Sequence, residues 1–258
     1  MVGCLHPYAL TTVATQRLAS FHPTHDTRKC REVGTAMTPT CYPIALVLDG
    51  KPCLVVGGGE IADGKLDALL LAGAVVTVVS PDVRPRIAAL AAEGQIALHQ
   101  RPYRTSDLEG IYLAIAATDD RPLNASVVSE AREAGILTQA VDDIPYCDFF
   151  AVAIVRRGDL QLGISTNGRS PAFARWMRER LDSELPAEYG DLLAVLSDVR
   201  DTIKARGPIP TYEHWQAAIT DEVVAALGTG DRERATARIY ERVSAGIGHT
   251  TAHEESTR

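Results

Sequence analysis

The sequence has few aromatic residues, no long hydrophobic run and almost no histidine away from its two ends. Aromatic residues make up 5% of the 258 positions, and of the seven histidines only His99 and His214 lie in the interior of the sequence. No apolar run reaches the roughly 18–20 residues that a membrane-spanning helix needs, so an integral membrane protein is not expected. The scarcity of interior histidine also argues against a histidine-rich centre, and we predict no protein metal site.

Cysteine occurs in an odd number and in no metal-binding spacing. The five cysteines are scattered and none forms a Cys-x-x-Cys pair, so neither a disulfide framework nor a cysteine-based zinc site is expected. No charged segment followed by an apolar segment opens the chain, which argues against a signal peptide and for a cytoplasmic protein. The formal net charge of -7 argues against a nucleic-acid partner, because such proteins usually present a basic face.

The hydrophobic pattern begins only after an irregular leading segment. Residues 1–40 show no period, which predicts a disordered tail or a start codon placed upstream of a true start near Met37. From 41 to 148, short apolar strands alternate with helical segments, as in βαβ units with a parallel sheet. We therefore predict an α/β fold with a Rossmann-like domain over 41–148.

The pattern changes after residue 148. Two strands are expected at 149–155 and 160–165 around a turn, and Ser170-Pro171 predicts the start of a helix that runs to about Ser183. These elements form a small α+β segment over 149–185. The remainder predicts a helical C-terminal domain over 186–248, followed by a disordered tail over 249–258. Its helices are expected near 188–205, 211–227 and 231–245.

A glycine-rich turn carries the strongest motif. Val55 and Val56 end an apolar strand, and Gly57-Gly58-Gly59-Glu60-Ile61-Ala62 then fits G-x-G-x-x-A at the start of a helix. In this motif Gly57 allows a tight turn, Gly59 lets the backbone approach a pyrophosphate, and the helix N-terminus faces the anion. The order of strand, glycines and helix predicts a dinucleotide site.

Other predicted strand ends place polar side chains near that site. Asp82 follows the second strand and is the candidate ribose ligand, although Arg84 and Arg86 come next and leave NADP open beside the favoured NAD. Thr118 and Asp119 follow a later strand, where they either meet the cofactor or only open a turn.

Asp142 and Asp143 end a further strand at the same edge of the sheet. A carboxylate there could act as a general acid or base if it were partly buried, whereas a turn cap is the simpler alternative. Composition and position alone do not decide between these two roles.

These motifs, in this order, resemble the precorrin-2 dehydrogenase family, which is the N-terminal module of siroheme synthases. Its bifunctional members are also sirohydrochlorin ferrochelatases. The resemblance runs from about residue 42 to 245. The stretches that carry it are Val55–Ala62 with Lys65, Ala114–Asp120 with Asn124, Val141–Asp143, and Ile164–Ala172 with Arg175 and Arg178–Leu181.

The resemblance implies that the protein oxidises precorrin-2 to sirohydrochlorin and passes a hydride to NAD. It maps the essential aspartate of the family, a general base or proton acceptor, to Asp142. It also implies that residues 149–185 form a homodimer and that the helical C-terminal domain helps to cover the tetrapyrrole. The implied NAD contacts are Gly57, Gly58, Gly59, Glu60, Ile61, Pro81 and Asp82, to which the strand-end argument adds Thr118 and Asp119.

Six arginines lie close together in this otherwise acidic chain. They are Arg156, Arg157, Arg169, Arg175, Arg178 and Arg180. Arginine suits paired contacts with carboxylates, and the implied substrate is a polycarboxylate, so we expect two or three of the six to face it. The candidate substrate-binding residues are Ser165, Thr166, Arg169 and Arg175. The alternative is that several arginines pair with the neighbouring acids Glu179, Asp182 and Glu184 on a helix surface.

The sequence leaves two further matters open. Metal insertion with Fe²⁺ or Co²⁺ as a substrate is compatible with the resemblance. Because the chain has no central His/Cys cluster, such a reaction would have to proceed without a dedicated metal site in the protein. Thr166 replaces a serine that some bifunctional relatives carry, which bears on chelation. The competing function is a non-enzymatic NAD-sensing regulatory domain, which would share the glycine loop but not the arginine-rich segment and helical tail.

Overall fold

The computed structural model describes residues 41–141, 143, 146–207 and 210–254, with side chains as far as residue 245. The predicted tail 1–40 and residues 255–258 of the predicted tail 249–258 lie outside the described residues. Residues 249–254 were expected to be disordered, and this is wrong, because they continue the last helix of the chain. The first half is a five-stranded parallel sheet in the order β3-β2-β1-β4-β5. Its strands are β1 (Pro52–Val56), β2 (Val75–Val79), β3 (Ala97–His99), β4 (Leu113–Ala116) and β5 (Leu137–Ala140).

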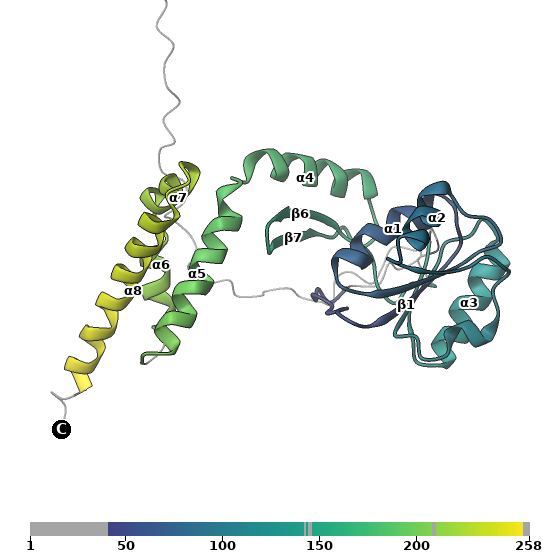
Figure 1. Cartoon of the computed structure of the whole chain (residues 1–258), viewed down its shortest axis with the longest axis horizontal. Coiled ribbons are helices and arrows are strands. Elements are labelled where there is room, and N and C mark those ends of the chain that lie inside the picture. The colour runs from purple at the N-terminus through teal and green to yellow at the C-terminus, as the bar shows by residue number, and fades with distance from the viewer. Residues whose placement is uncertain (1–40, 142, 144–145, 208–209, 255–258) are drawn as a thin grey trace, which may run out of the picture. The chain divides into compact units, whose positions relative to one another are not determined.

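Helices cover both faces of this sheet because its strands are apolar on both sides (Figure 1). Cys53 and Val55 of β1 pack with α1 (Glu60–Leu71) and α2 (Pro85–Ala92) on one face. Leu54 and Val56 pack with α3 (Arg121–Glu133) on the other. All four side chains are at most 2% exposed, as expected for a strand in the middle of a three-layer α/β domain.

The direction of winding reverses between β1 and β4. The chain runs from β1 outward through β2 to β3, then returns through the short 3₁₀ helix η1 (Thr105–Leu108) to β4 beside β1. At such a point the loops after the neighbouring strands diverge and leave a crevice at the carboxyl edge of the sheet. The predicted Rossmann-like domain is therefore confirmed, and its topology fixes where a ligand would bind.

A two-stranded antiparallel sheet follows, made of β6 (Ala153–Arg157) and β7 (Leu160–Ile164). The strand expected from residue 149 begins at 153, since Phe149 packs against the core of the sheet domain and residues 150–152 line a cavity described below. The helix α4 (Pro171–Glu184) starts as predicted, because Ser170 Oγ accepts a hydrogen bond of 3.2 Å from the Phe173 amide.

The helical region has its own core. Its helices are α5 (Glu188–Lys204), α6 (Tyr212–Ala218), α7 (Asp221–Gly228) and α8 (Arg232–Glu254). Val195, Ile239 and Val243 are completely buried there. The single helix expected over 211–227 is wrong: the backbone is extended at Ile219 and Thr220, and two acidic residues then open the first turn of α7.

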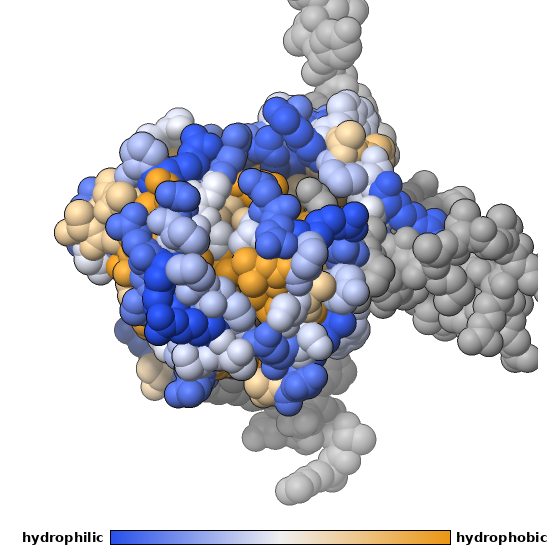
Figure 2. Space-filling view, turned by 90° about the vertical axis from the view of Figure 1, so that its right-hand side faces the viewer, coloured by the Kyte–Doolittle hydropathy of each residue, from blue (hydrophilic) through white to orange (hydrophobic). Residues whose placement is uncertain are grey.

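The sheet domain presents a mainly hydrophilic surface with a hydrophobic area near its centre in the view of Figure 2. None of the helices in the described part of the chain combines the length and the apolar character that crossing a bilayer requires.

Candidate functional site

The glycine turn after β1 is built around close backbone approaches. Gly57 has a φ of 125°, and a Cβ there would collide with the Ala117 carbonyl. A Cβ on Gly58 would collide with the Asp82 carbonyl. Gly59 differs, because a Cβ built on it meets no protein atom within 4 Å. The first two glycines are thus required by the fold, whereas the space at Gly59 is open to a ligand at the N-terminus of α1.

A cavity of about 820 Å³ opens at this turn. All nine predicted cofactor residues line it: Gly57, Gly58, Gly59, Glu60, Ile61, Pro81, Asp82, Thr118 and Asp119. The lining also includes Ser80, Val83, Arg84, Ala117 and Leu123, which were not predicted. They lie after β2, after β4 or in the first turn of α3, at the carboxyl edge of the sheet where the direction of winding reverses. The open cradle at Gly59 and the size of the cavity fit a dinucleotide.

Asn124 fixes the Thr118 turn at the edge of this cavity. Its side-chain oxygen accepts hydrogen bonds from the Thr118 amide at 3.1 Å and hydroxyl at 2.7 Å, and its amide donates to the Thr118 carbonyl at 2.8 Å. Asp120 caps α3 by accepting a 3.1 Å hydrogen bond from the Leu123 amide. Asn124 is 6% exposed and holds the cofactor-side turn instead.

The charges around the cavity favour NAD over NADP. Asp82 lines the cavity, where its carboxylate would repel a 2′-phosphate and accept from a ribose hydroxyl. Arg84 lies 3.4 Å from Glu60 and 3.6 Å from Asp63. Arg86 pairs with Asp63 at 2.5 Å and also with Asp67. Both arginines are therefore engaged by acids of α1.

A second cavity of about 400 Å³ lies between the end of β5 and the segment that follows it. Ser165 and Thr166 line it as predicted for the substrate site, whereas Arg169 and Arg175 are not among its lining residues. Val141 and Asp143 also line it. Asp142 lies outside the described residues. The other lining residues are Lys65, Gln139, Ala140, Cys147, Phe150, Ala151, Val152, Ala153, Ile164, Gly168, Pro171 and Ala174.

Most of the arginine cluster is occupied by acidic neighbours. Four of the six form ion pairs, namely Arg157 with Asp182 at 2.8 Å, Arg175 with Glu179 at 2.9 Å, Arg178 with Glu179 at 3.4 Å, and Arg180 with Glu184 at 2.9 Å. Arg156 lies 3.4 Å from Gln161. The structure thus shows the helix-surface pairing that the sequence offered as the alternative, and it brings Lys65 to the second cavity instead.

The two cavities adjoin at the carboxyl edge of the sheet. Ala116 of β4 is paired with Ala140 of β5, so the residues after β4 that line the first cavity lie beside those that line the second. Ile61 lines the first cavity and Lys65 the second, and a spacing of four residues puts both on one face of α1. A nucleotide and a second ligand would therefore meet along one strand pair and one helix face.

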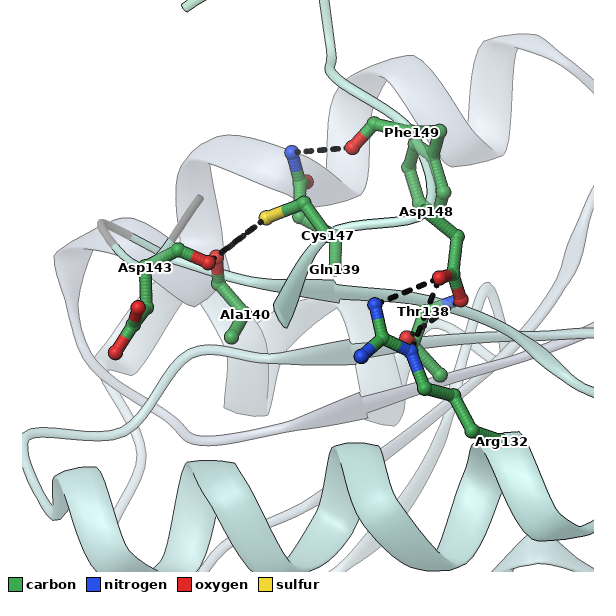
Figure 3. A network of polar contacts seen from close by, with 8 residues as sticks. All are labelled: Arg132, Thr138, Gln139, Ala140, Asp143, Cys147, Asp148 and Phe149. Atoms are coloured by element: carbon green, nitrogen blue, oxygen red, sulfur yellow. Dashed lines mark hydrogen bonds and ion pairs between the residues drawn. The ribbon is translucent and has the colours of Figure 1, made fainter. Parts of the chain in front are cut away.

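A polar network holds the two ends of the loop that carries Val141 and Asp143 (Figure 3). Asp148 accepts hydrogen bonds from the Thr138 amide at 3.0 Å and hydroxyl at 2.8 Å, and from Arg132 at 2.7 and 3.0 Å. Partial burial raises the pKa of Asp148, but the bonds from Arg132 and Thr138 outweigh it and lower that pKa below its usual value.

Cys147 contacts backbone carbonyls at the start of the same loop and within it. Burial is the main cause that raises the pKa of its thiol, so the thiol stays protonated and can donate. It donates to the Ala140 carbonyl at 3.0 Å and approaches the Asp143 carbonyl at 3.4 Å. Cys147 and Asp148 together tie the loop to β5, and we refer to these two residues as the β5 clasp.

Replacing Asp148 with Asn is expected to lower the free energy of unfolding by about 1–3 kcal/mol near neutral pH, because two charge-assisted contacts are lost. The pKa of Asp148 is lowered in the folded protein, so its contribution is present above about pH 4 and is lost as pH falls through the folded value. The difference between the two proteins should therefore shrink in acid. Urea unfolding at neutral and acidic pH measures it.

Asp159→Asn is the matched control, because Asp159 is exposed in the turn between β6 and β7. It should leave the free energy of unfolding unchanged at both pH values. A loss for Asp148→Asn that stayed constant with pH would contradict the electrostatic account of the clasp.

Among the residues that the structure describes, no group of three or more His, Cys, Asp or Glu side chains is arranged to hold a metal ion.

Comparison with protein families gives two matches in chain order. Residues 44–153 match a family described as putative NAD(P)-binding, and residues 157–184 match the sirohaem biosynthesis protein central family. The first match contains the glycine turn, the segments that follow β2 and β4, and the β5 clasp. The second contains only the last residue of β6, Arg157, and all of β7 and α4.

Curated relatives and a solved structure agree with these matches. A siroheme synthase of Chromobacterium violaceum is 38% identical over 207 residues, which cover 80% of this chain and 44% of that protein. One from Methylococcus capsulatus is 42% identical over 168 residues, covering 65% and 35%. The structure titled "SirC, precorrin-2 dehydrogenase" superposes with a TM-score of 0.63 at 27% identity, covering 78% of this chain and 100% of that one. The chain thus spans less than half the length of these siroheme synthases, and the resemblance predicted from its motifs is confirmed.

Proposed function

We propose, from the premise that this chain carries the NAD(P)-binding and central regions of the siroheme-synthase family in their order, that it is an NAD-dependent precorrin-2 dehydrogenase. The product would be sirohydrochlorin. The relatives reported above bear the names of enzymes, which favours this function over nucleotide sensing.

The observation that carries the proposal is the junction of the two cavities. Hydride transfer requires a nucleotide and its reaction partner to lie in contact, with water kept away from the reacting atoms. The Gly59 turn and Asp82 shape the nucleotide side, while Ser165 and Thr166 contribute to the other side. Since the two sides share α1 and the β4–β5 edge, the arrangement suits a bound tetrapyrrole beside a nicotinamide.

In this mechanism NAD supplies the hydride acceptor. The chain must supply a base for the proton that leaves the substrate. In the sequence Asp142 and Asp143 follow the strand end at which the second cavity lies. We assign that role to Asp142. The β5 clasp would then serve the reaction, because it ties the loop that carries the proposed base to β5.

The proposal includes a homodimer formed by residues 149–185. Helix α4 contains no buried residue, and its Phe173 and Trp176 are 53% and 51% exposed. Their rings stack with centroids 5.7 Å apart and form an apolar surface that a second copy could cover. Sedimentation of the full chain tests this: a monomer at micromolar concentration would refute it.

One assay tests the activity. Purified protein mixed anaerobically with precorrin-2 and NAD should produce NADH together with the absorption spectrum of sirohydrochlorin. NADP in place of NAD should support a much slower reaction, because Asp82 lines the nucleotide cavity. If precorrin-2 remains unoxidised with either nucleotide, the dehydrogenase proposal fails.

A second stage of the assay addresses metal insertion. Ferrous or cobaltous ion, the proposed metal substrates, is added once oxidation is complete. A spectral shift to the metallated product that exceeds the rate without protein supports chelatase activity. A rate equal to that without protein restricts the function to dehydrogenation.

A further inference from the structure

Gln139 of β5 is a buried amide on an apolar face of the sheet. Its side chain is 7% exposed and lies on the same face as Leu137, which packs with the core on the α1 side. In the register of β4 and β5 it stands opposite Ile115, which is 3% exposed in that core. An apolar residue is the usual occupant of such a position, because burying an amide costs free energy unless hydrogen bonds replace those it made to water.

Half of this amide is without a hydrogen bond. Nε2 donates to the Phe149 carbonyl at 3.5 Å, which is long for such a bond (Figure 3). Oε1 accepts no hydrogen bond from the part of the chain that the structure describes. Turning the amide over would set Oε1 against the Phe149 carbonyl, acceptor against acceptor, so the oxygen remains the unpartnered atom.

The other buried polar side chains contrast with Gln139. Within the described ranges, the buried polar or charged side chains are those of Asp63, Ser80, Asn124, Thr138 and Gln139. Each of the first four makes a hydrogen bond or ion pair of at most 2.8 Å. Gln139 is the member of this set that lines the second cavity. The unpartnered oxygen therefore belongs to the residue that stands beside a candidate ligand site.

We propose that Oε1 of Gln139 accepts a hydrogen bond from a ring N–H of the tetrapyrrole in the second cavity. The inference rests on the proposed function and adds a substrate-binding residue to it. The carboxylates of the substrate are ionised at neutral pH and have no proton to donate, whereas the ring nitrogens of the unmetallated macrocycle carry N–H groups. A neutral acceptor at this wall therefore selects the ring over its carboxylates and fixes which part of the substrate faces β5.

A small movement of the side chain suffices for this contact. Oε1 is closed off from solvent as the amide stands. The terminal torsion of glutamine is broad, and the long bond to Phe149 holds the amide only weakly, so the amide can turn toward a ligand at low cost. The backbone of Gln139 is fixed by β4 on one side and by a bridge to Cys147 on the other, so only the amide moves.

Gln139→Met removes the acceptor and nearly preserves the length of the side chain. Equilibrium binding of sirohydrochlorin should weaken about 3- to 10-fold, the range for one neutral hydrogen bond. The KM for precorrin-2 should rise by a similar factor, with the kcat changed by less than about threefold and the Kd for NAD unchanged. The urea concentration at half-unfolding, measured without ligand, should stay the same or rise, because the variant no longer buries an unpartnered oxygen.

The metal complex of the same ligand identifies the donor. A metal ion replaces the N–H protons of the ring, so the parent protein and Gln139→Met should bind nickel sirohydrochlorin with equal affinity. Weaker binding of the nickel complex by the variant would show that the donor is not a ring N–H and would overturn the proposal. Weaker NAD binding with unchanged sirohydrochlorin binding would also overturn it, because the donor would then be the carboxamide of the nicotinamide.

Gln95→Met is the matched control. Gln95 is exposed, donates to Glu93 at 2.7 Å, and lines neither the nucleotide cavity nor the second cavity. The same substitution there should leave the affinity for sirohydrochlorin and the KM for precorrin-2 unchanged. NAD binding verifies that each variant is folded, and Gln139→Leu replaces Gln139→Met should the latter fail that check.

Two further results would overturn the assignment of Gln139. One is unchanged sirohydrochlorin affinity in the folded variant. The other is a loss of stability together with the loss of affinity, which would make Gln139 a structural residue of the sheet. A parent protein that neither oxidises precorrin-2 nor binds sirohydrochlorin would instead refute the proposed function, so the two failures are distinguishable.

Discussion

Replacing Gly59 with Asp is expected to weaken NAD binding by about 100-fold or more while the protein stays folded. The substituted carboxylate would stand at the N-terminus of α1, where the pyrophosphate is expected, and like charges in such a position cost several kcal/mol. The fold should tolerate the change, because a Cβ at this residue meets no protein atom within 4 Å. Asp is also a favourable residue at the helix N-cap, which Gly59 occupies.

Calorimetric titration with NAD measures the affinity, and thermal unfolding with and without NAD measures the stability. The parent protein should gain thermal stability from NAD, whereas Gly59→Asp should gain none. Gly64→Asp is the matched control, because Gly64 lies on the same helix, also has open space at its Cβ, and does not line the nucleotide cavity. Unchanged NAD affinity in Gly59→Asp would show that the nucleotide does not bind at this turn.

Gly57 shows why the position of the substitution matters. Its φ of 125° and its contact with the Ala117 carbonyl make any side chain incompatible with the turn. Loss of NAD binding in a Gly57 variant would therefore reflect a damaged fold rather than a blocked site. Gly57 is thus required for folding, whereas a substitution at Gly59 can change NAD binding without changing the fold.

The nucleotide half of the site was predictable from sequence because its determinants are local. A strand, a glycine turn and a helix follow one another, and the ends of parallel strands necessarily meet at one edge. The sequence alone therefore predicts Asp82, Thr118 and the three glycines at one site, and all of them line one cavity. Ser80 and Leu123 were missed, although they stand beside predicted residues and line the same cavity.

The substrate half was less predictable because it depends on side-chain pairing across elements. Arg175 and Arg180 each have an acid four residues later, and that spacing pairs them along α4. Arg157 finds Asp182 on a different element, which the sequence could name as an option but not select. Lys65 was part of the recognised motif, yet its approach to the loop after β5 is set by the packing of α1 on the sheet.

The helical region shows a similar limit. Apolar residues recur at helical spacing throughout 211–227, so periodicity alone favours one continuous helix. The break between α6 and α7 instead depends on packing, because Ala218 and Val223 on either side of it are both buried in one core. Such a break is selected by tertiary contacts, which the sequence pattern does not report.

Replacing Asp142 with Ala is expected to lower the kcat for precorrin-2 oxidation by about 10²- to 10⁴-fold, the usual contribution of a positioned general base. The Kd for NAD should not change, because Asp142 is outside the glycine turn and the other assigned nucleotide contacts. The KM for precorrin-2 should change little, since the role assigned to Asp142 is proton acceptance rather than binding. Stopped-flow measurement of NADH formation gives the rate of the chemical step.

Asp143→Ala separates the two neighbouring carboxylates. Asp143 lines the second cavity but pairs with Arg121 at 3.0 Å, so we assign it a structural role and expect most of the parent kcat to remain. Asp142→Asn should behave as Asp142→Ala does, because an amide matches the shape of the carboxylate without its basicity. If Asp143→Ala loses the activity and Asp142→Ala retains it, the base is Asp143, and the hydride-transfer site still lies at the end of β5.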